Sequence, residues 1–214
     1  MKLWIDTAIV ILILTNLKLI SSSRLSASIR TVTLQGILLG VLPVSVTTGG
    51  PSLRVIFLSL ITVSLKGLVF PWLLLRTLKA ANVKREVEPL VGYTQSLIIG
   101  IGLLGLSIWL STRLPLPIPF QHPMVAPLSF FTIMIGLFTI IGRRKALTQI
   151  LGYLVMENGI YTFGLAFAHQ APLLVELGTL LDVFMGVFVM GITIFHINRE
   201  FDHIDTDLLS SLRD

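Results

Sequence analysis

Apolar residues in this chain gather in seven long runs, which are separated by short polar or charged joints. The runs cover residues 3–20, 28–48, 53–79, 91–110, 125–142, 146–168 and 172–197. A helix needs roughly 20 predominantly apolar residues to cross the hydrocarbon core of a bilayer. All seven runs have about this length, and the fifth is the shortest. The pattern therefore predicts an all-α integral membrane protein with about seven transmembrane helices.

Lysine and arginine residues are distributed unevenly between the two ends of these runs. When successive joints are assigned alternately to two sides, 12 of the 16 Lys and Arg residues fall on one side and 3 on the other, while Lys66 lies inside a run. Cytoplasmic loops of membrane proteins carry the excess of basic residues. The bias predicts an N-terminus outside and a C-terminus in the cytoplasm, which requires an odd number of spans. The loop from Arg143 to Lys145 and the tail from Asn198 are then cytoplasmic.

Two segments of the chain resemble each other. Residues 60–89 match residues 177–204 in a polar pair, Leu-Lys against Leu-Asp, and in a charged ending, NVKREVE against INREFD. In that register Lys66 stands where Asp182 stands. Duplication is common in membrane transporters, but shared hydropathy also produces such matches, so duplication of a three-helix unit is a hypothesis. It predicts an N-terminal three-helix unit at 1–90, a fourth helix and proline-rich joint at 91–124, a C-terminal three-helix unit at 125–200 and a cytoplasmic tail at 201–214.

Composition supports the membrane assignment and excludes several kinds of chemistry. Of the 214 residues 54% are hydrophobic and 13% charged, and the mean hydropathy is +0.90, well outside the range of a soluble domain. The sequence has no cysteine, which excludes disulfides, thiolate metal sites and iron–sulfur clusters. It also has no phosphate-binding loop, metal-ligand spacing or dinucleotide turn, so we expect no cofactor and no catalytic activity from the chain by itself. The net charge of +5 comes from short clusters between apolar runs, where a topology signal explains it better than nucleic-acid binding does.

Two carboxylates interrupt the last two apolar runs near their middles. Glu157 and Asp182 lie about ten residues inside their runs, so the rise of a helix places each near the bilayer centre. A charge at that depth costs a few kcal/mol, and ionisable residues there mark proton or ion pathways by default. Burial disfavours the charged form of a carboxyl group, which lets such a group both load and release a proton. The alternative is a protonated or paired acid that only joins helices.

Lys66 is a basic residue deep inside an apolar run, about thirteen residues from its start. An ammonium group at that depth cannot easily reach the interface and needs a carboxylate partner or a water-filled cavity. We predict that Lys66 takes part in a proton relay with an acid, and a purely structural ion pair is the alternative. Glu176 is a weaker relay candidate, because it lies near the outer end of the seventh run, where hydration explains it equally well.

The last third of the chain resembles a known family. Its pattern consists of Arg143 and Arg144, a helix with the sequence VMENG, a short loop followed by PLLVELG, and a second acid within LLDVF. Over this part the chain resembles subunit K of respiratory complex I and the matching small subunit of multi-subunit sodium/proton antiporters. Over its whole length it more closely resembles component E of hydrogenase-4, which is found in formate hydrogenlyase and other group 4 membrane-bound hydrogenase complexes.

This resemblance implies a non-catalytic membrane-arm subunit of a redox-driven complex in a bacterial or archaeal cytoplasmic (inner) membrane. The subunit would lie beside antiporter-like subunits and contribute buried ionisable residues to coupled proton or cation translocation. Asp182 takes the place of the family's second helix acid, whereas Glu157 lies about one helical turn beyond the first. Lys66 has no counterpart in the three-helix subunit. Two other interpretations stay open: a scaffold subunit whose acids are permanently protonated, and a small independent transporter.

Overall fold

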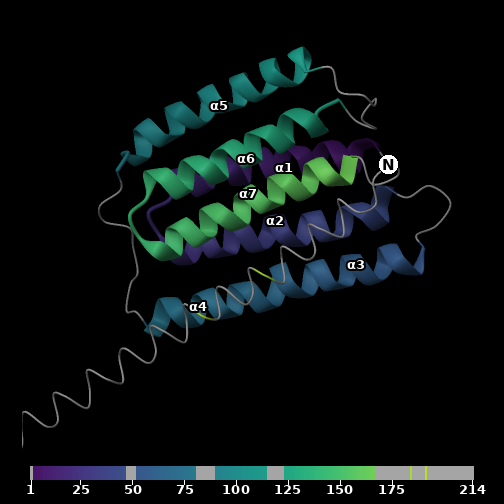
Figure 1. Ribbon diagram of the computed structural model, residues 1–214, viewed down its shortest axis with the longest axis horizontal. Helices are drawn as coiled ribbons and strands as arrows, with labels where there is room; N and C mark the ends of the chain where they lie inside the picture. The colour runs from purple at the N-terminus through teal and green to yellow at the C-terminus, as the bar shows by residue number, and fades with distance from the viewer. Residues whose placement is uncertain are drawn as a thin grey trace, which may run out of the picture.

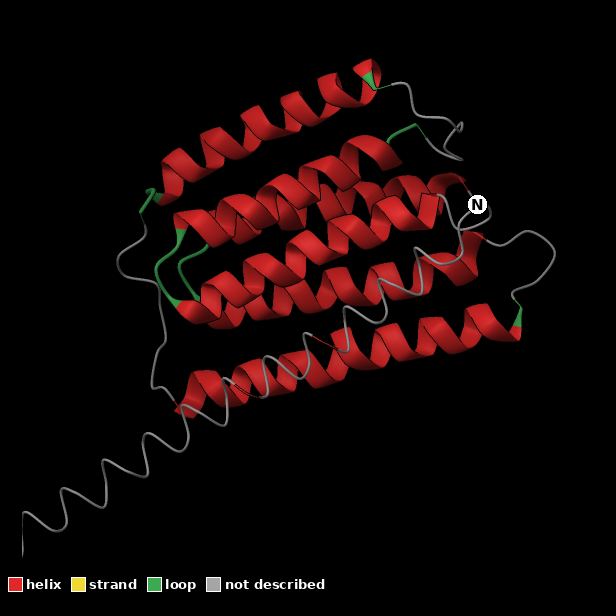
Figure 2. Ribbon diagram, in the orientation of Figure 1, coloured by secondary structure: helices red, strands yellow, loops and turns green. Residues whose placement is uncertain are grey.

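A computed structural model describes residues 2–46, 52–80, 90–114 and 123–166, together with the single residues Phe184 and Gly191. Every regular element in these four ranges is helical, as Figure 2 shows. The elements are α1 (Lys2–Ser21), α2 (Leu25–Val46), α3 (Leu53–Ser64), the π-helical turn η1 (Leu65–Val69), α4 (Phe70–Ala80), α5 (Tyr93–Arg113), α6 (Val125–Gly142) and α7 (Ala146–Ala166). Because α3, η1 and α4 are continuous, they form one long helical segment.

The first six apolar runs correspond to these segments, and their ends agree to within about three residues. Five segments are long and apolar enough to cross a membrane, namely Leu3–Ser21, Leu25–Ser45, Leu53–Lys79, Tyr93–Arg113 and Val125–Gly142. Helix α7 is 21 residues long, but Gln149, Glu157 and Asn158 lower its hydropathy. The all-helical class is thus confirmed for the described residues, which include five candidate membrane spans. The seventh run lies outside them except for Phe184 and Gly191, so the count of seven stays a prediction.

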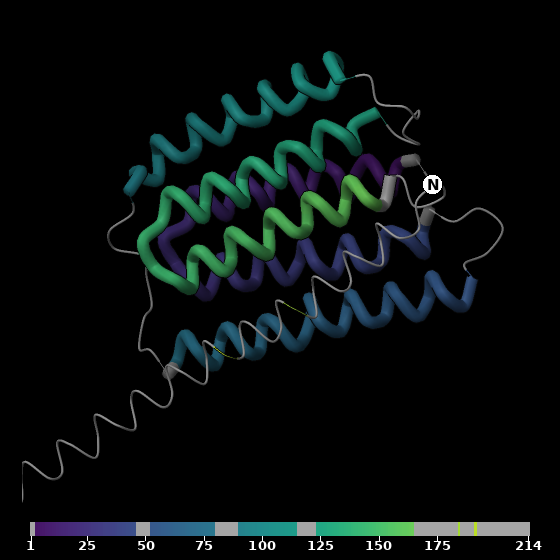
Figure 3. Tube along the Cα trace, in the orientation of Figure 1, coloured from purple at the N-terminus to yellow at the C-terminus, as the bar shows by residue number. Residues whose placement is uncertain are grey.

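Four helices form the centre of the bundle. Helix α1 packs on α2, α2 on α7, α7 on α6, and α6 on α1, which closes a ring of contacts. Helix α5 lies along α1 and α6 at one edge, and the long segment α3–η1–α4 lies along α2 at the opposite edge (Figure 1). Successive segments run in opposite directions (Figure 3). Any side chain that reaches from the long segment to α7 must therefore pass α2.

Helices α6 and α7 approach each other through glycines. A Cβ atom on Gly136 would overlap the backbone of Met156, and one on Gly159 would lie 2.6 Å from the backbone nitrogen of Ile133. Only residues without a side chain permit such an approach, which is typical of helices that associate in membranes. The close contact fixes the rotation of α7 and hence the direction in which its polar residues point.

The joint between α6 and α7 is held by a buried arginine. Arg143 is 3% exposed and donates hydrogen bonds to the backbone carbonyls of Ile20 at 2.7 Å and Val91 at 3.3 Å. Its guanidinium lies 4.6 Å from the ring centroid of Tyr93. The last carbonyls of a helix lack partners within the helix, so Arg143 caps α1 and also ties down the start of α5. The charge pattern identified Arg143 only as a loop residue, a description that fits its exposed neighbour Arg144.

The long third segment departs from α-helical geometry at its centre. In η1 the N–H of Phe70 donates to the carbonyl of Leu65, five residues earlier. Pro71 follows directly and has no N–H group, so it cannot donate to the carbonyl of Gly67, its α-helical acceptor. Turns of this kind occur frequently at functional sites. Lys66 lies within this widened turn.

Candidate proton-transfer site

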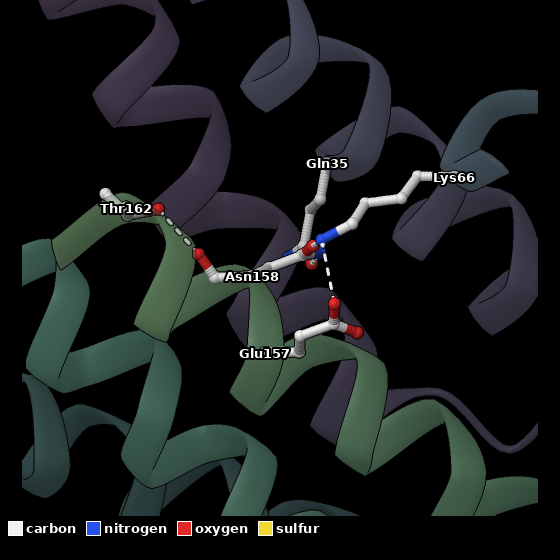
Figure 4. A network of polar contacts seen from close by, with 5 residues as sticks. All are labelled: Gln35, Lys66, Glu157, Asn158 and Thr162. Atoms are coloured by element: carbon white, nitrogen blue, oxygen red, sulfur yellow. Dashed lines mark hydrogen bonds and ion pairs between the residues drawn. The ribbon is translucent and has the colours of Figure 1, made fainter. Parts of the chain in front are cut away.

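Lys66 reaches from the edge of the bundle into the space between α2 and α7. A Cβ atom on Gly36 of α2 would overlap the Cβ atom of Lys66, so the absence of a side chain at Gly36 lets the lysine pass. The lysine is only 5% exposed. Figure 4 shows its side chain extending from η1 toward Glu157 and Asn158 of α7. The local sequence thus directs a basic group into the apolar centre of the chain.

Glu157 lies opposite the lysine and compensates its charge. The Lys66 Nζ atom is 3.6 Å from Glu157 Oε1, and the carboxylate side chain is 1% exposed. That separation is an ion pair rather than a direct hydrogen bond. Among the described residues, neither carboxylate oxygen of Glu157 has a hydrogen-bond partner. The carboxyl group can therefore gain or lose a proton without breaking a hydrogen bond in the described part of the chain.

The ammonium group donates its short hydrogen bond to a neutral amide. Lys66 Nζ lies 2.9 Å from Asn158 Oδ1, and the face of the Tyr161 ring lies on another side, with its centroid 5.3 Å away. The backbone carbonyl of Asn158 accepts a hydrogen bond from the hydroxyl of Thr162 at 2.7 Å. A carboxylate, an amide oxygen and an aromatic face all stabilise a positive charge. The site is thus built to stabilise an ammonium group that is largely shielded from bulk solvent.

Further polar residues extend this site across the bundle. The Asn158 amide donates to Gln35 Oε1 at 3.4 Å, and Gln35 Nε2 donates to Thr15 Oγ1 at 3.0 Å and to Asn16 Oδ1 at 2.9 Å. Both Gln35 and Asn16 are fully buried. Sequence reasoning missed these two amides because it considered only charged groups. The signal was present, since an amide within an apolar run also needs partners in the membrane.

A small cavity lies beside the lysine, between α2, α4 and α7. Its volume is about 10 Å³, room for about one water molecule. Three polar side chains, Thr33, Lys66 and Asn158, line it, and the rest of the lining consists of Ile29, Val32, Phe70, Pro71, Leu74 and Leu154. One water molecule in this cavity would contact the side chain of Lys66, one of the residues of the predicted proton relay.

The structure brings two of the four predicted relay residues together. Lys66 and Glu157 face each other, whereas Asp182 and Glu176 lie outside the described residues. Within the described ranges, no group of three or more His, Cys, Asp and Glu residues could hold a metal ion. The chemistry that this site supports is proton exchange between a carboxyl group, an amine and water.

Known proteins match the chain in two ways. Residues 124–214 match the protein family described as NADH-ubiquinone/plastoquinone oxidoreductase chain 4L. The uncharacterized protein Rv0085 of Mycobacterium tuberculosis is 33% identical over 208 residues, which cover 95% of this chain and 93% of that protein. Hydrogenase-4 component E of Escherichia coli (strain K12) is 29% identical over 144 residues, which cover 65% of this chain and 66% of that protein. The chain therefore belongs to the same family as Rv0085, and it is similar to hydrogenase-4 component E. No solved structure matches it.

The match to chain 4L covers only part of the site. It begins at residue 124 and so includes α6, α7 and Glu157, but not α1 to α5. Lys66, Gln35 and Asn16 come from the preceding segments. The site therefore combines an acid from the region that matches chain 4L with a lysine and two amides from the region before residue 124.

Proposed function

We propose that this chain is a non-catalytic membrane-arm subunit of a redox-driven, complex I-like complex, in which Glu157 and Lys66 carry protons. Similarity to hydrogenase-4 component E supports the assignment to such a complex, and the match to chain 4L supports a place in its membrane arm. The partners are antiporter-like and other membrane-arm subunits in a bacterial or archaeal inner membrane. Asp182 and Glu176 belong to the same proposed relay.

One observation carries the choice of proton transfer over a purely structural pair. Glu157 is buried, lies 3.6 Å from an ammonium group and accepts no hydrogen bond from the described residues. A structural ion pair gains stability only when hydrogen bonds satisfy its remaining acceptors. A relay carboxyl must change its protonation state repeatedly, which is easiest when no hydrogen bond has to break. The geometry of Glu157 therefore favours a relay over permanent pairing.

The proposal includes a topology and a domain organisation. Seven helices cross the membrane, with the N-terminus outside and the tail at 201–214 in the cytoplasm. The units at 1–90 and 125–200 are duplicated three-helix units, connected through 91–124. In this arrangement Lys66 belongs to the first unit and Glu157 to the second, so the site lies where the two units meet.

The test replaces the acid with its amide. Glu157→Gln keeps the shape of the side chain and an oxygen that can accept from Lys66, so the complex should assemble normally. Proton translocation coupled to the redox reaction should fall to a small fraction of wild type, because an amide cannot exchange a proton in this way. We would measure both in membrane vesicles that contain the whole complex. The matched control is Asp6→Asn, since Asp6 is an exposed acid on α1, and its coupling should be unchanged.

A scaffold role predicts the opposite pattern. If Glu157 is permanently protonated, Glu157→Gln should translocate protons normally, whereas the truncation Glu157→Ala should prevent assembly. That combination of results would replace the relay with the scaffold interpretation.

A further inference from the structure

The hydrogen bonds that start at Lys66 form a chain with one direction. An ammonium group only donates hydrogen bonds, so Asn158 must present its oxygen to Lys66. Its Nδ2 group then faces Gln35, which must present Oε1 in turn. Gln35 is left with Nε2 as a donor toward Asn16. The charge on Lys66 thereby fixes the orientation of the amides that follow it.

The chain continues through α1 into α6 with the same direction. Asn16 accepts from Gln35 and donates from Nδ2 to Thr132 Oγ1 at 2.8 Å. The Thr132 hydroxyl donates to the backbone carbonyl of Leu128 at 2.8 Å. Each side chain from Asn158 to Thr132 thus accepts on the side of the lysine and donates on the far side. The dipoles of three buried amides therefore point with their oxygen ends toward the ammonium group.

Such a chain stabilises a charge but does not conduct protons. Hydrogen bonds in a low dielectric polarise one another, so aligned dipoles strengthen the bond that the ammonium group donates to Asn158. The side-chain amides of Asn and Gln have no titratable proton near neutral pH, so a proton cannot pass along them. Any effect of these amides on proton transfer must therefore act through Lys66.

We infer that Gln35 and Asn16 are positioning residues that hold Lys66 as an ammonium group beside Glu157, and that their amide chain is not a proton path. The inference rests on the proposed function of the Lys66–Glu157 pair and adds the residues that hold Lys66 in place beside Glu157. Within the described part of the site, proton exchange takes place at Glu157, Lys66 and any water in the neighbouring cavity, and not along the amides. The amides connect the charge of Lys66 to α1, α2 and α6.

The direct test observes the ammonium protons of Lys66. The full chain has six lysines, so ¹⁵N-lysine labelling in lipid nanodiscs gives few NH₃⁺ signals, and Lys66→Met identifies the one from Lys66. Wild type should show a signal protected from exchange with water. Gln35→Met preserves the side-chain volume but removes the three hydrogen bonds of the Gln35 amide. It should speed the exchange by about tenfold or more, as expected for weakening a hydrogen bond to a charged group. Asn16→Leu should have a smaller effect because it is one step further away.

The control is another amide of the same bundle. Gln149 of α7 donates to the backbone carbonyl of Arg143 and is not one of the hydrogen-bonded amides that start at Lys66, so Gln149→Met should leave the Lys66 signal unchanged. An unprotected Lys66 signal in wild type, or unchanged exchange in Gln35→Met, would overturn the inference. If Gln35→Met does not fold, Asn16→Leu decides the question by the same criterion.

A measurement of coupling separates this inference from the proposed function. In vesicles with the whole complex, Gln35→Met should lower coupled proton translocation in the wild-type background and cause no further loss in the Lys66→Met background, since it acts through Lys66. An equal further loss would overturn the positioning role. Normal coupling in Lys66→Met itself would refute the proposed function, whereas the exchange experiment would still report whether the amides hold the ammonium group.

Discussion

Lys66 and Glu157 compensate each other's charge 3.6 Å apart inside the bundle. Removing one member of a buried ion pair costs about 3–5 kcal/mol, whereas replacing both members is often nearly neutral. The energetic effect of either residue therefore depends on the other. The ammonium group also donates a hydrogen bond to Asn158, so the energetic effects of all three side chains depend on one another.

The double variant measures this dependence. Lys66→Met should lower the free energy of unfolding by up to about 3–5 kcal/mol, because it leaves a buried carboxyl group without its counter-charge. Lys66→Met combined with Glu157→Gln should regain part of that loss. Unfolding of the detergent-solubilised chain by denaturant would report both values. Strictly additive losses would show that the two side chains do not interact.

The sequence was sufficient to select these two residues but not to pair them. A single charge in an apolar run is conspicuous because the membrane makes it costly. Which acid meets Lys66 depends on which helix faces η1, and that arises from the ring of contacts through α2 and α7. The amides of Gln35 and Asn16 carry no charge, so the same reasoning passed over them.

At the level of elements, helix positions followed from the apolar runs, but the local distortion that directs Lys66 did not. Hydropathy has no term for a π-helical turn, although Pro71 marks a place where the hydrogen-bond pattern must change. The close approach of α2 to η1 at Gly36 is equally invisible in a pattern of apolar residues. The direction of the functional side chain thus depends on two features of backbone geometry.

Gly36 provides a test of this positioning. Gly36→Ala would place a methyl group against the Cβ atom of Lys66, so the long segment must move away from α2. We expect the Lys66–Asn158 hydrogen bond to weaken and coupled proton translocation to fall, with little change in the amount of complex assembled. The matched control is Gly102→Ala on α5, where a Cβ atom meets nothing within 4 Å. Equal coupling in the two variants would contradict the role of the glycine.

Arg143 provides a test of how the helices are held together. Arg143→Gln removes a charged donor from the carbonyls of Ile20 and Val91. The free energy of unfolding should fall by about 1.5–3 kcal/mol, as for one hydrogen bond to a charged group. Arg144→Gln, at the exposed neighbouring position, should change it by less than about 0.5 kcal/mol. Equal stability of the two variants in thermal unfolding would show that the buried arginine does not clamp α1 and α5.

For the molecule as a whole, the bundle separates its basic residues between two ends. Because successive segments are antiparallel (Figure 3), the ends of α1, α4 and α6 lie together with the starts of α2, α5 and α7. Near that end lie Lys18, Arg24, Arg30, Arg76, Lys79 and Arg144, whereas Arg54 and Arg113 lie near the other. Basic residues favour the cytoplasmic side, so the end of the bundle that carries the joint between α6 and α7 should face the cytoplasm.

Labelling of single cysteines tests this orientation and also the number of spans. The chain has no cysteine of its own, so Arg144→Cys and Ser211→Cys each give one reactive site. Six segments return the chain to the side of the N-terminus, so a cytoplasmic tail requires a further crossing between α7 and Ser211. We expect a membrane-impermeant maleimide to label both cysteines in inverted vesicles and neither in intact cells, while Ser52→Cys at the start of α3 should label only from outside.

Arg144→Cys labelled from outside would refute the orientation. Ser211→Cys labelled from outside, with Arg144→Cys labelled from inside, would refute the seventh span and leave the site of Lys66 and Glu157 in a bundle of six helices.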